Sequence, residues 1–155
     1  MHSSPQSKPI AVTGGTGHTG RFVLDELEHR GLKAILVARD ARKLAEAGAV
    51  YRGSLTRLAH IDDPGSLDAA LAGVAAVVNC AGPFLDTALP VVEAALRAEI
   101  PYLDVAAEQA AVQAIRARDA DARRAGVTVL PAAAFYGGLA DLLAPSGPSK
   151  LNRCR

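Results

Sequence analysis

Short apolar runs alternate along the chain with longer segments in which apolar positions recur every three or four residues. The runs lie at residues 8–13, 33–38, 74–80, 102–105 and 127–130, with a weaker one within 50–61. We expect a strand at each, because a short apolar run bounded by Gly, Pro, Asn or Asp is typical of a buried strand. Most of these runs are apolar throughout, which predicts a sheet covered on both faces.

The longer segments predict helices between the strands, at 18–30, 41–47, 64–72, 88–98, 108–125 and, as a final short helix, 139–144. In the first helix we expect Phe22, Val23 and Leu27 to share one apolar face. The fourth is placed so that Pro90 falls in its first turn, and Asp63 is expected to cap the third. Strands that alternate with helices predict an α/β fold, a doubly wound parallel sheet of about six strands.

A glycine-rich segment, TGGTGHTG at residues 13–20, joins the first expected strand to the first expected helix. Gly14 permits a sharp turn, Gly17 leaves room for a pyrophosphate, and Gly20 lets the helix pack close to the strand. The N–H groups at the helix start would hold the phosphates. We therefore predict a Rossmann-like NAD(P)-binding domain, the alternative being a tight turn without a ligand. The predicted cofactor contacts are Thr13, Gly14, Gly15, Thr16, Gly17, His18, Thr19 and Gly20.

Basic residues follow the second expected strand: Arg39 directly, and Arg42 and Lys43 about one turn later. An acid here would accept hydrogen bonds from the ribose of NAD, whereas the planar guanidinium of arginine suits a 2′-phosphate. We therefore predict NADP(H) over NAD(H) and interpret Asp40 as a helix N-cap. Two alternatives stay open: Asp40 is the ribose-binding acid, or the basic side chains form a solvated helix face.

Polar residues also follow the next two buried runs, where the carboxyl ends of parallel strands line a ligand crevice. The first run supplies further cofactor candidates, namely Asn79, Ala81, Gly82 and Pro83, while Cys80 is expected to be buried and inert. The catalytic candidates are Asp104, Glu108 and Tyr136, because carboxylates and phenols near a nicotinamide can bind substrate or shuttle a proton. The alternative makes Asp104 a loop cap and Glu108 a charge in a first helical turn.

Composition narrows the function classes. The chain has 155 residues, enough for one domain, and its 17 Lys and Arg against 16 Asp and Glu argue against nucleic acid as a partner. Four scattered histidines and two distant cysteines give no metal-binding spacing, so we expect no metal. No tyrosine is followed four residues later by lysine, so the common short-chain dehydrogenase dyad is missing. Without a secretory signal or a membrane-spanning run, we expect a cytoplasmic protein with no membrane span.

Several segments together resemble the NADP-binding domain of the saccharopine dehydrogenase-like family, which includes saccharopine reductases and trans-acting enoyl reductases. NCAGPF at 79–84 and YLDVAAEQ at 102–109 are the specific ones, since the glycine loop alone does not separate this family from NmrA-like relatives. The resemblance implies an oxidoreductase that transfers hydride to or from a small-molecule substrate. It also implies pyrophosphate contacts at Gly14, Thr16, Gly17, His18 and Thr19, an adenosine phosphate contact at Arg39, and nicotinamide contacts at Ala81 and Gly82.

The chain departs from the family pattern in two places. It reads AAFYG at 133–137, where members often carry a Cys-Gly-Phe-Asp-like stretch. Members also continue with a second, substrate-binding domain, which we expect to be absent here. We expect a disordered N-terminus at 1–7, a dinucleotide-binding domain at 8–144 and a disordered tail at 145–155. The expected protein is incomplete as a catalyst, and a full-length form would be a homodimer. The alternatives are an NmrA-like NADP(H)-binding regulatory module and a non-functional truncated fragment.

Overall fold

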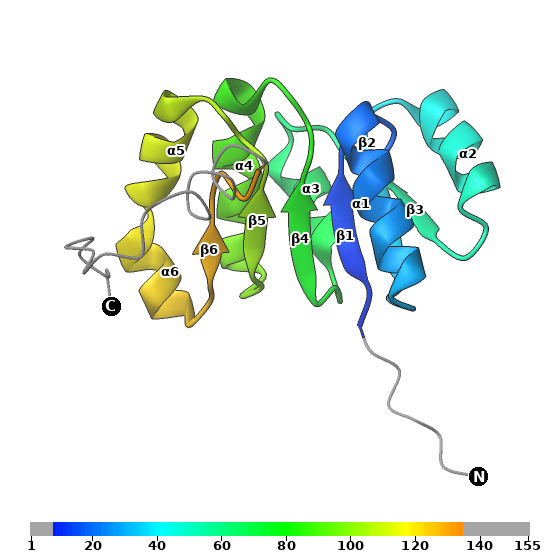
Figure 1. The fold of residues 1–155 in the computed structure, drawn as a ribbon. Coiled ribbons are helices and arrows are strands. Elements are labelled where there is room, and N and C mark those ends of the chain that lie inside the picture. The colour runs from blue at the N-terminus through cyan, green and yellow to red at the C-terminus, as the bar shows by residue number, and fades with distance from the viewer. Residues whose placement is uncertain (1–7, 135–155) are drawn as a thin grey trace, which may run out of the picture.

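The computed structural model describes residues 8–134, which form a six-stranded sheet with helices on its two faces (Figure 1). All neighbouring strands are parallel, in the order β3-β2-β1-β4-β5-β6. The strands are β1 Ile10–Thr13, β2 Ala34–Ala38, β3 Leu55–Leu58, β4 Ala76–Asn79, β5 Tyr102–Asp104 and β6 Val129–Leu130. The helices are α1 His18–His29, α2 Ala41–Val50, α3 Pro64–Leu71, α4 Phe84–Arg97, α5 Gln109–Arg116 and α6 Asp119–Ala125. The predicted α/β fold with a doubly wound parallel sheet is confirmed.

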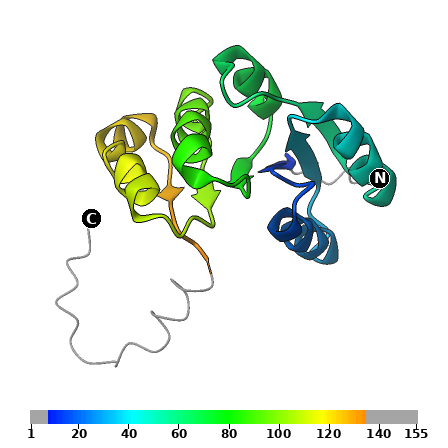
Figure 2. The same cartoon turned by 90° about the horizontal axis from the view of Figure 1, so that it is seen from above.

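Two apolar clusters hold the helices to the sheet, one on each face, and Figure 2 shows the layers from above. On one face, side chains of α1 and α2 such as Leu24 and Leu44 pack on Val12 and Leu36. On the other face α3, α4 and α5 cover a larger cluster around Val77 and its neighbours. Successive strands are added on one side of β1 as far as β3 and on its other side from β4 onward, so the carboxyl ends of β1 and β4 form the switch point at which such sheets bind ligands.

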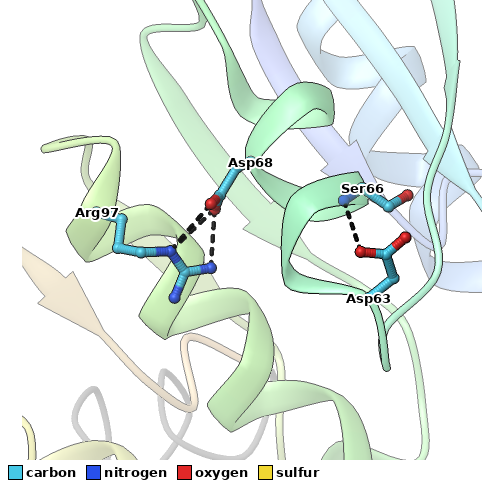
Figure 3. A network of polar contacts seen from close by, with 4 residues as sticks. All are labelled: Asp63, Ser66, Asp68 and Arg97. Atoms are coloured by element: carbon cyan, nitrogen blue, oxygen red, sulfur yellow. Dashed lines mark hydrogen bonds and ion pairs between the residues drawn. The ribbon is translucent and has the colours of Figure 1, made fainter.

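Polar contacts fix α3 in its place (Figure 3). Asp63 caps the helix as predicted, because its carboxylate accepts a hydrogen bond from the Ser66 backbone N–H at 3.1 Å. On the opposite side of the helix, the guanidinium of Arg97 in α4 donates to the Asp68 carboxylate, with Nη2 2.8 Å from Oδ1. This ion pair is half exposed, so it orients the two helices more than it stabilises them.

Three expectations about the helices are wrong. α4 begins at Phe84 instead of residue 88, so Pro90 lies inside the helix, where it cannot donate to the carbonyl of Asp86. The single helix expected over 108–125 is two helices, because the chain turns at Ala117 and Arg118. Phe22 is 62% exposed and does not lie on the buried face of α1 with Leu27. The buried residues of that face are Gly20, Leu24 and Leu27.

The strand expectations hold within one or two residues at most ends, and the weak run within 50–61 forms β3. This strand lies at the edge of the sheet and is mostly exposed, which explains its poor apolar pattern. The helix expected at 139–144 lies outside the described residues. Between residues 8 and 134, no helix combines the length and the apolar character that a membrane crossing requires.

Candidate functional site

A cleft of about 340 Å³ opens at the carboxyl ends of β1, β2 and β4. The glycine loop forms one wall, and the segments that follow β2 and β4 form the others. A further wall, which the sequence reasoning missed, comes from the segment after β3 and from α3. The lining residues are Thr13, Gly14, Thr16, Gly17, Val37, Ala38, Arg39, Asp40, Lys43, Ala59, Ile61, Leu67, Cys80, Ala81, Gly82 and Thr87.

Gly14 makes the turn that ends β1. Its φ of +68° is a left-handed conformation that disfavours any side chain. A Cβ atom there would lie 2.7 Å from the backbone of both Cys80 and Ala81, so the loop after β4 could not approach as it does. The Gly14 N–H donates to the Val37 carbonyl at 3.0 Å, which fixes the turn against β2. The predicted turn at Gly14 is therefore present, and the missing side chain lets the loop after β4 pack against it.

Gly17 and Gly20 set the distance between the loop and α1. A Cβ atom on Gly20 would lie 2.3 Å from the carbonyl oxygen of Gly14, so only glycine permits this close packing. Gly17 is exposed, and a Cβ there would meet only the Gly14 oxygen, at 3.2 Å. No side chain caps α1 at Gly17, which leaves the first N–H groups of the helix for a ligand.

The side chains after β2 separate into two groups. Arg39 and Lys43 line the cleft, whereas Arg42 does not and instead donates from Nη1 to the Glu46 carboxylate at 3.1 Å. Asp40 caps α2, because its Oδ1 accepts from the Lys43 backbone N–H at 3.0 Å. That hydrogen bond lowers the pKa of Asp40, which is the acidic residue among those lining the cleft. The interpretation of Asp40 as a helix cap is confirmed.

A chain of buried hydrogen bonds runs beneath the cleft from β1 to β5. The Thr13 hydroxyl donates to Asn79 Oδ1 at 2.7 Å, and Asn79 Nδ2 donates to the Tyr102 hydroxyl at 3.3 Å. Tyr102 in turn donates to Asp104 Oδ2 at 2.8 Å. Asn79 Oδ1 also accepts from the Ala81 N–H at 3.0 Å, so the amide positions the loop after β4. Asn79 and Thr13 thus order the backbone around the cleft from below.

Asp104 ends this chain and is fully buried. Its Oδ1 accepts from the backbone N–H groups of Ala106, at 3.0 Å, and of Ala132, at 2.7 Å. The second bond holds Ala132 in a left-handed conformation with a φ of +57°. Among the residues that the structure describes, no buried side-chain polar atom lacks a hydrogen-bond partner. Asp104 therefore acts as a loop cap here, and its carboxylate does not reach the cleft.

Glu108 holds the start of α4. Its Oε1 accepts from the Phe84 N–H at 3.2 Å and its Oε2 from the Ala107 N–H at 3.0 Å. The Ala107 hydrogen bond is the main reason why the pKa of Glu108 is lowered. The Thr87 hydroxyl, which the sequence reasoning missed, donates to the Ala81 carbonyl and ties the same helix to the loop after β4. Both side chains shape the cleft without offering a free acid or base.

The remaining candidates divide by position. Cys80 lines the cleft and is half-buried, and desolvation raises the pKa of its thiol to about 11, so it stays protonated at neutral pH. His18 packs its ring edge-on against Phe22, with the centroids 5.1 Å apart. Gly15 is buried, and Thr19 and Pro83 are exposed beside the cleft. Tyr136 lies outside the described residues. Within residues 8–134 no three His, Cys, Asp or Glu side chains are grouped to hold a metal ion.

Comparisons of structure give similar folds in larger proteins. The apo saccharopine dehydrogenase (L-Glu forming) of Saccharomyces cerevisiae matches 82% of this chain at 23% identity with a TM-score of 0.69. The match covers only 27% of the yeast enzyme. The match to the Citrobacter sp. triphenylmethane reductase complexed with NADP(H) covers 79% of this chain and 48% of the reductase, at 22% identity and a TM-score of 0.61. The match to the Escherichia coli quinone oxidoreductase QOR2 complexed with NADPH covers 79% of this chain and 47% of the oxidoreductase, at 23% identity and a TM-score of 0.59.

These structures share the fold of this chain, and the chain spans from about a quarter to about half of their length. No curated protein matches the chain in sequence. A family model does: the one described as the saccharopine dehydrogenase NADP binding domain matches residues 10–130, from the first residue of β1 to the last of β6. The chain therefore belongs to the saccharopine dehydrogenase NADP-binding domain family.

Proposed function

We propose that the chain is the NADP(H)-binding domain of an oxidoreductase that transfers hydride to or from a small-molecule substrate. One observation supports this proposal most: the cleft carries two cations, Arg39 directly after β2 and Lys43 in the first turn of α2. Its acidic residue, Asp40, is engaged as the cap of α2, where its Oδ1 accepts from the Lys43 N–H. A site selective for NAD would instead need a carboxylate free to accept from the ribose hydroxyls.

The residues of the cleft fit such a cofactor along its whole length. The pyrophosphate would lie at Gly17, where the missing side chain leaves the backbone exposed and α1 presents its positive end, next to the turn at Gly14. The adenine would lie against the apolar wall, which comprises Ala59, Ile61 and Leu67. The nicotinamide would face the loop after β4. When bound, the cofactor would supply or accept the hydride, while these residues bind and orient it.

The relatives support the choice of cofactor. The family model is described as NADP-binding, and two similar folds carry NADP(H) or NADPH in their structures. Their substrates are not transferred to this chain, because identities below 25% establish only the shared fold.

A second candidate function is a module that binds NADP(H) without turnover. It is favoured by the state of the catalytic candidates, since Asp104 is buried in a hydrogen-bond chain and Glu108 holds the start of α4. Among the described residues that line the cleft, no carboxylate is left without such a partner to act as a general acid or base. Under the first proposal, hydride transfer needs substrate-binding residues in addition to those described.

Titration of the full chain with NADPH and with NADH, followed by cofactor fluorescence, tests the proposal. We expect NADPH to bind about 10- to 150-fold more tightly, since a hydrogen bond to a charged group contributes about 1.5–3 kcal/mol. Arg39→Gln should remove most of this preference and leave NADH binding unchanged. Arg30→Gln is the matched control, because Arg30 pairs with Glu26 at the far end of α1.

The two candidate functions differ in turnover. Oxidation of NADPH by the chain in the presence of small imine or enoyl acceptors supports the oxidoreductase, and tight binding without oxidation favours the module. A sample that is folded by circular dichroism but binds neither dinucleotide contradicts both.

A further inference from the structure

A second groove, of about 400 Å³, opens between α1 and α2 beside the cofactor cleft. It shares Thr16 and Lys43 with the cleft, and its other lining residues are Arg21, Glu46, Ala47, Val50 and Tyr51. A group bound at the boundary between the two hollows would therefore be reached from both sides. The two shared residues belong to the glycine loop after β1 and to the first turn of α2, and the adenosine ribose is expected near them, at the end of β2.

The charges at the groove are not balanced. Within the part of the chain that the structure describes, the guanidinium of Arg21 and the ammonium of Lys43 make no side-chain hydrogen bond or ion pair. Glu46 is engaged by Arg42 at 3.1 Å, and Asp40 by the Lys43 backbone N–H. The groove thus offers two free cations while the acids around it already have donors, which favours an anionic occupant.

The walls of the groove are connected to each other. Tyr51, at the end of α2, donates from its hydroxyl to Asp25 Oδ1 at 2.8 Å, and the same hydroxyl is 3.4 Å from the backbone oxygen of Arg21. Asp25 is therefore also occupied, and the backbone that carries Arg21 is fixed relative to α2. Binding of an anion between Arg21 and Lys43 therefore has to order only their two exposed side chains and not the helices that carry them, which reduces the ordering cost of binding.

We infer that Arg21 is a specificity-determining residue that, with Lys43, contacts the 2′-phosphate of the adenosine from the groove, while Arg39 contacts it from the cleft. This inference rests on the proposed function. It also changes the composition of the phosphate site: spacing in the sequence pointed to Arg42, which pairs with Glu46 and does not line either hollow. Arg21 takes its place from a different helix.

Fluorescence titrations of the full chain with NADPH and NADH test this inference. Arg21→Gln is expected to raise the Kd for NADPH roughly tenfold and to leave the Kd for NADH within about twofold. Arg42→Gln should weaken NADPH binding much less than Arg21→Gln. Arg30→Gln, on the same helix as Arg21 and paired with Glu26, is the matched control for a lost surface charge. Arg21→Lys should recover part of the loss, because it keeps the charge but not the planar fork.

The outcomes separate this inference from the proposed function. A wild-type preference for NADPH that Arg21→Gln leaves intact overturns the role of Arg21 alone. Equal losses for NADPH and NADH show that Arg21 supports the loop and does not read the 2′-phosphate, which also overturns it. An effect of Arg42→Gln as large as that of Arg21→Gln restores the assignment based on spacing. A wild-type chain without preference for NADPH contradicts both proposals.

Discussion

Gly20→Ala tests whether close packing of α1 on the glycine loop requires glycine. Helix propensity alone favours the substitution, because alanine is about 1 kcal/mol better than glycine in a helix interior. The structure opposes it. The new Cβ would lie 2.3 Å from the Gly14 carbonyl oxygen and 2.7 Å from Gly15 Cα, and both are backbone atoms that cannot rotate away.

The steric cost is expected to exceed the gain in propensity. Overpacking in a close-packed region costs about 1–3 kcal/mol, and a backbone contact this short belongs at the upper end of that range. After the propensity gain is subtracted, we expect a net destabilisation of about 2 kcal/mol, or a Tm lower by roughly 4–8 °C for a chain of this size. NADPH should also bind more weakly, because the loop must move to relieve the contact.

Urea unfolding followed by circular dichroism, together with NADPH titration, provides the assay. Gly53→Ala is the matched control, since a Cβ there meets nothing within 4 Å, and it should leave both measurements unchanged. If Gly20→Ala were as stable as the wild type and bound NADPH equally well, the packing argument for this glycine would be wrong.

Three further predictions follow from the site. Gly17→Ala should lower the unfolding free energy by only about 1 kcal/mol but weaken NADPH binding clearly. Its Cβ would meet one atom of the folded chain, the Gly14 carbonyl oxygen at 3.2 Å, which a small shift relieves, whereas it would intrude on a bound pyrophosphate. Unchanged NADPH binding would contradict this. Tyr102→Phe should lower the unfolding free energy by about 1–3 kcal/mol in urea, since it leaves Asp104 Oδ2 and Asn79 Nδ2 without their buried partner, and an unchanged midpoint would refute it. In a Cys154→Ser background, iodoacetamide should modify Cys80 at pH 8.5 roughly tenfold more slowly in the folded chain than in urea, because burial raises the thiol pKa from 9.0 to about 11. NADPH should slow the reaction further, since Cys80 lines the cleft. Equal rates in the folded and unfolded chain would show that the thiol is not desolvated.

Local patterns were sufficient for the parts of the fold that depend on neighbours in the chain. Apolar runs located the strands, and the spacing of Gly14, Gly17 and Gly20 predicted a strand–turn–helix junction with the observed close approach. The break between α5 and α6 was missed because alanine and arginine favour helix on both sides of it. At the turn itself, the guanidinium of Arg118 contacts Glu93 in α4, a tertiary contact that the sequence pattern does not show.

The site shows the same division. Spacing placed Arg39, Arg42 and Lys43 within one turn. The i, i+4 spacing of Arg42 and Glu46 was the available signal that Arg42 pairs along the helix, but which side chain faces the cleft depends on how α2 sits against the end of β2. The catalytic interpretation of Asp104 was equally open in the sequence. Two of its partners, the Tyr102 hydroxyl and the Ala106 N–H, are two residues away in the chain, but the Ala132 N–H reaches it only when the segment after β6 lies beside β5.

Hydrogen exchange of backbone amides, measured with and without saturating NADPH, tests the central claim most directly. The account predicts that NADPH slows exchange at residues 14–20 and 80–82, which form the glycine loop and the loop after β4, and at residues 39–43 after β2. NADH at the same concentration should protect residues 39–43 much less, since it lacks the 2′-phosphate. Protection elsewhere in the chain with none at the glycine loop, or equal protection of residues 39–43 by both dinucleotides, would contradict the account.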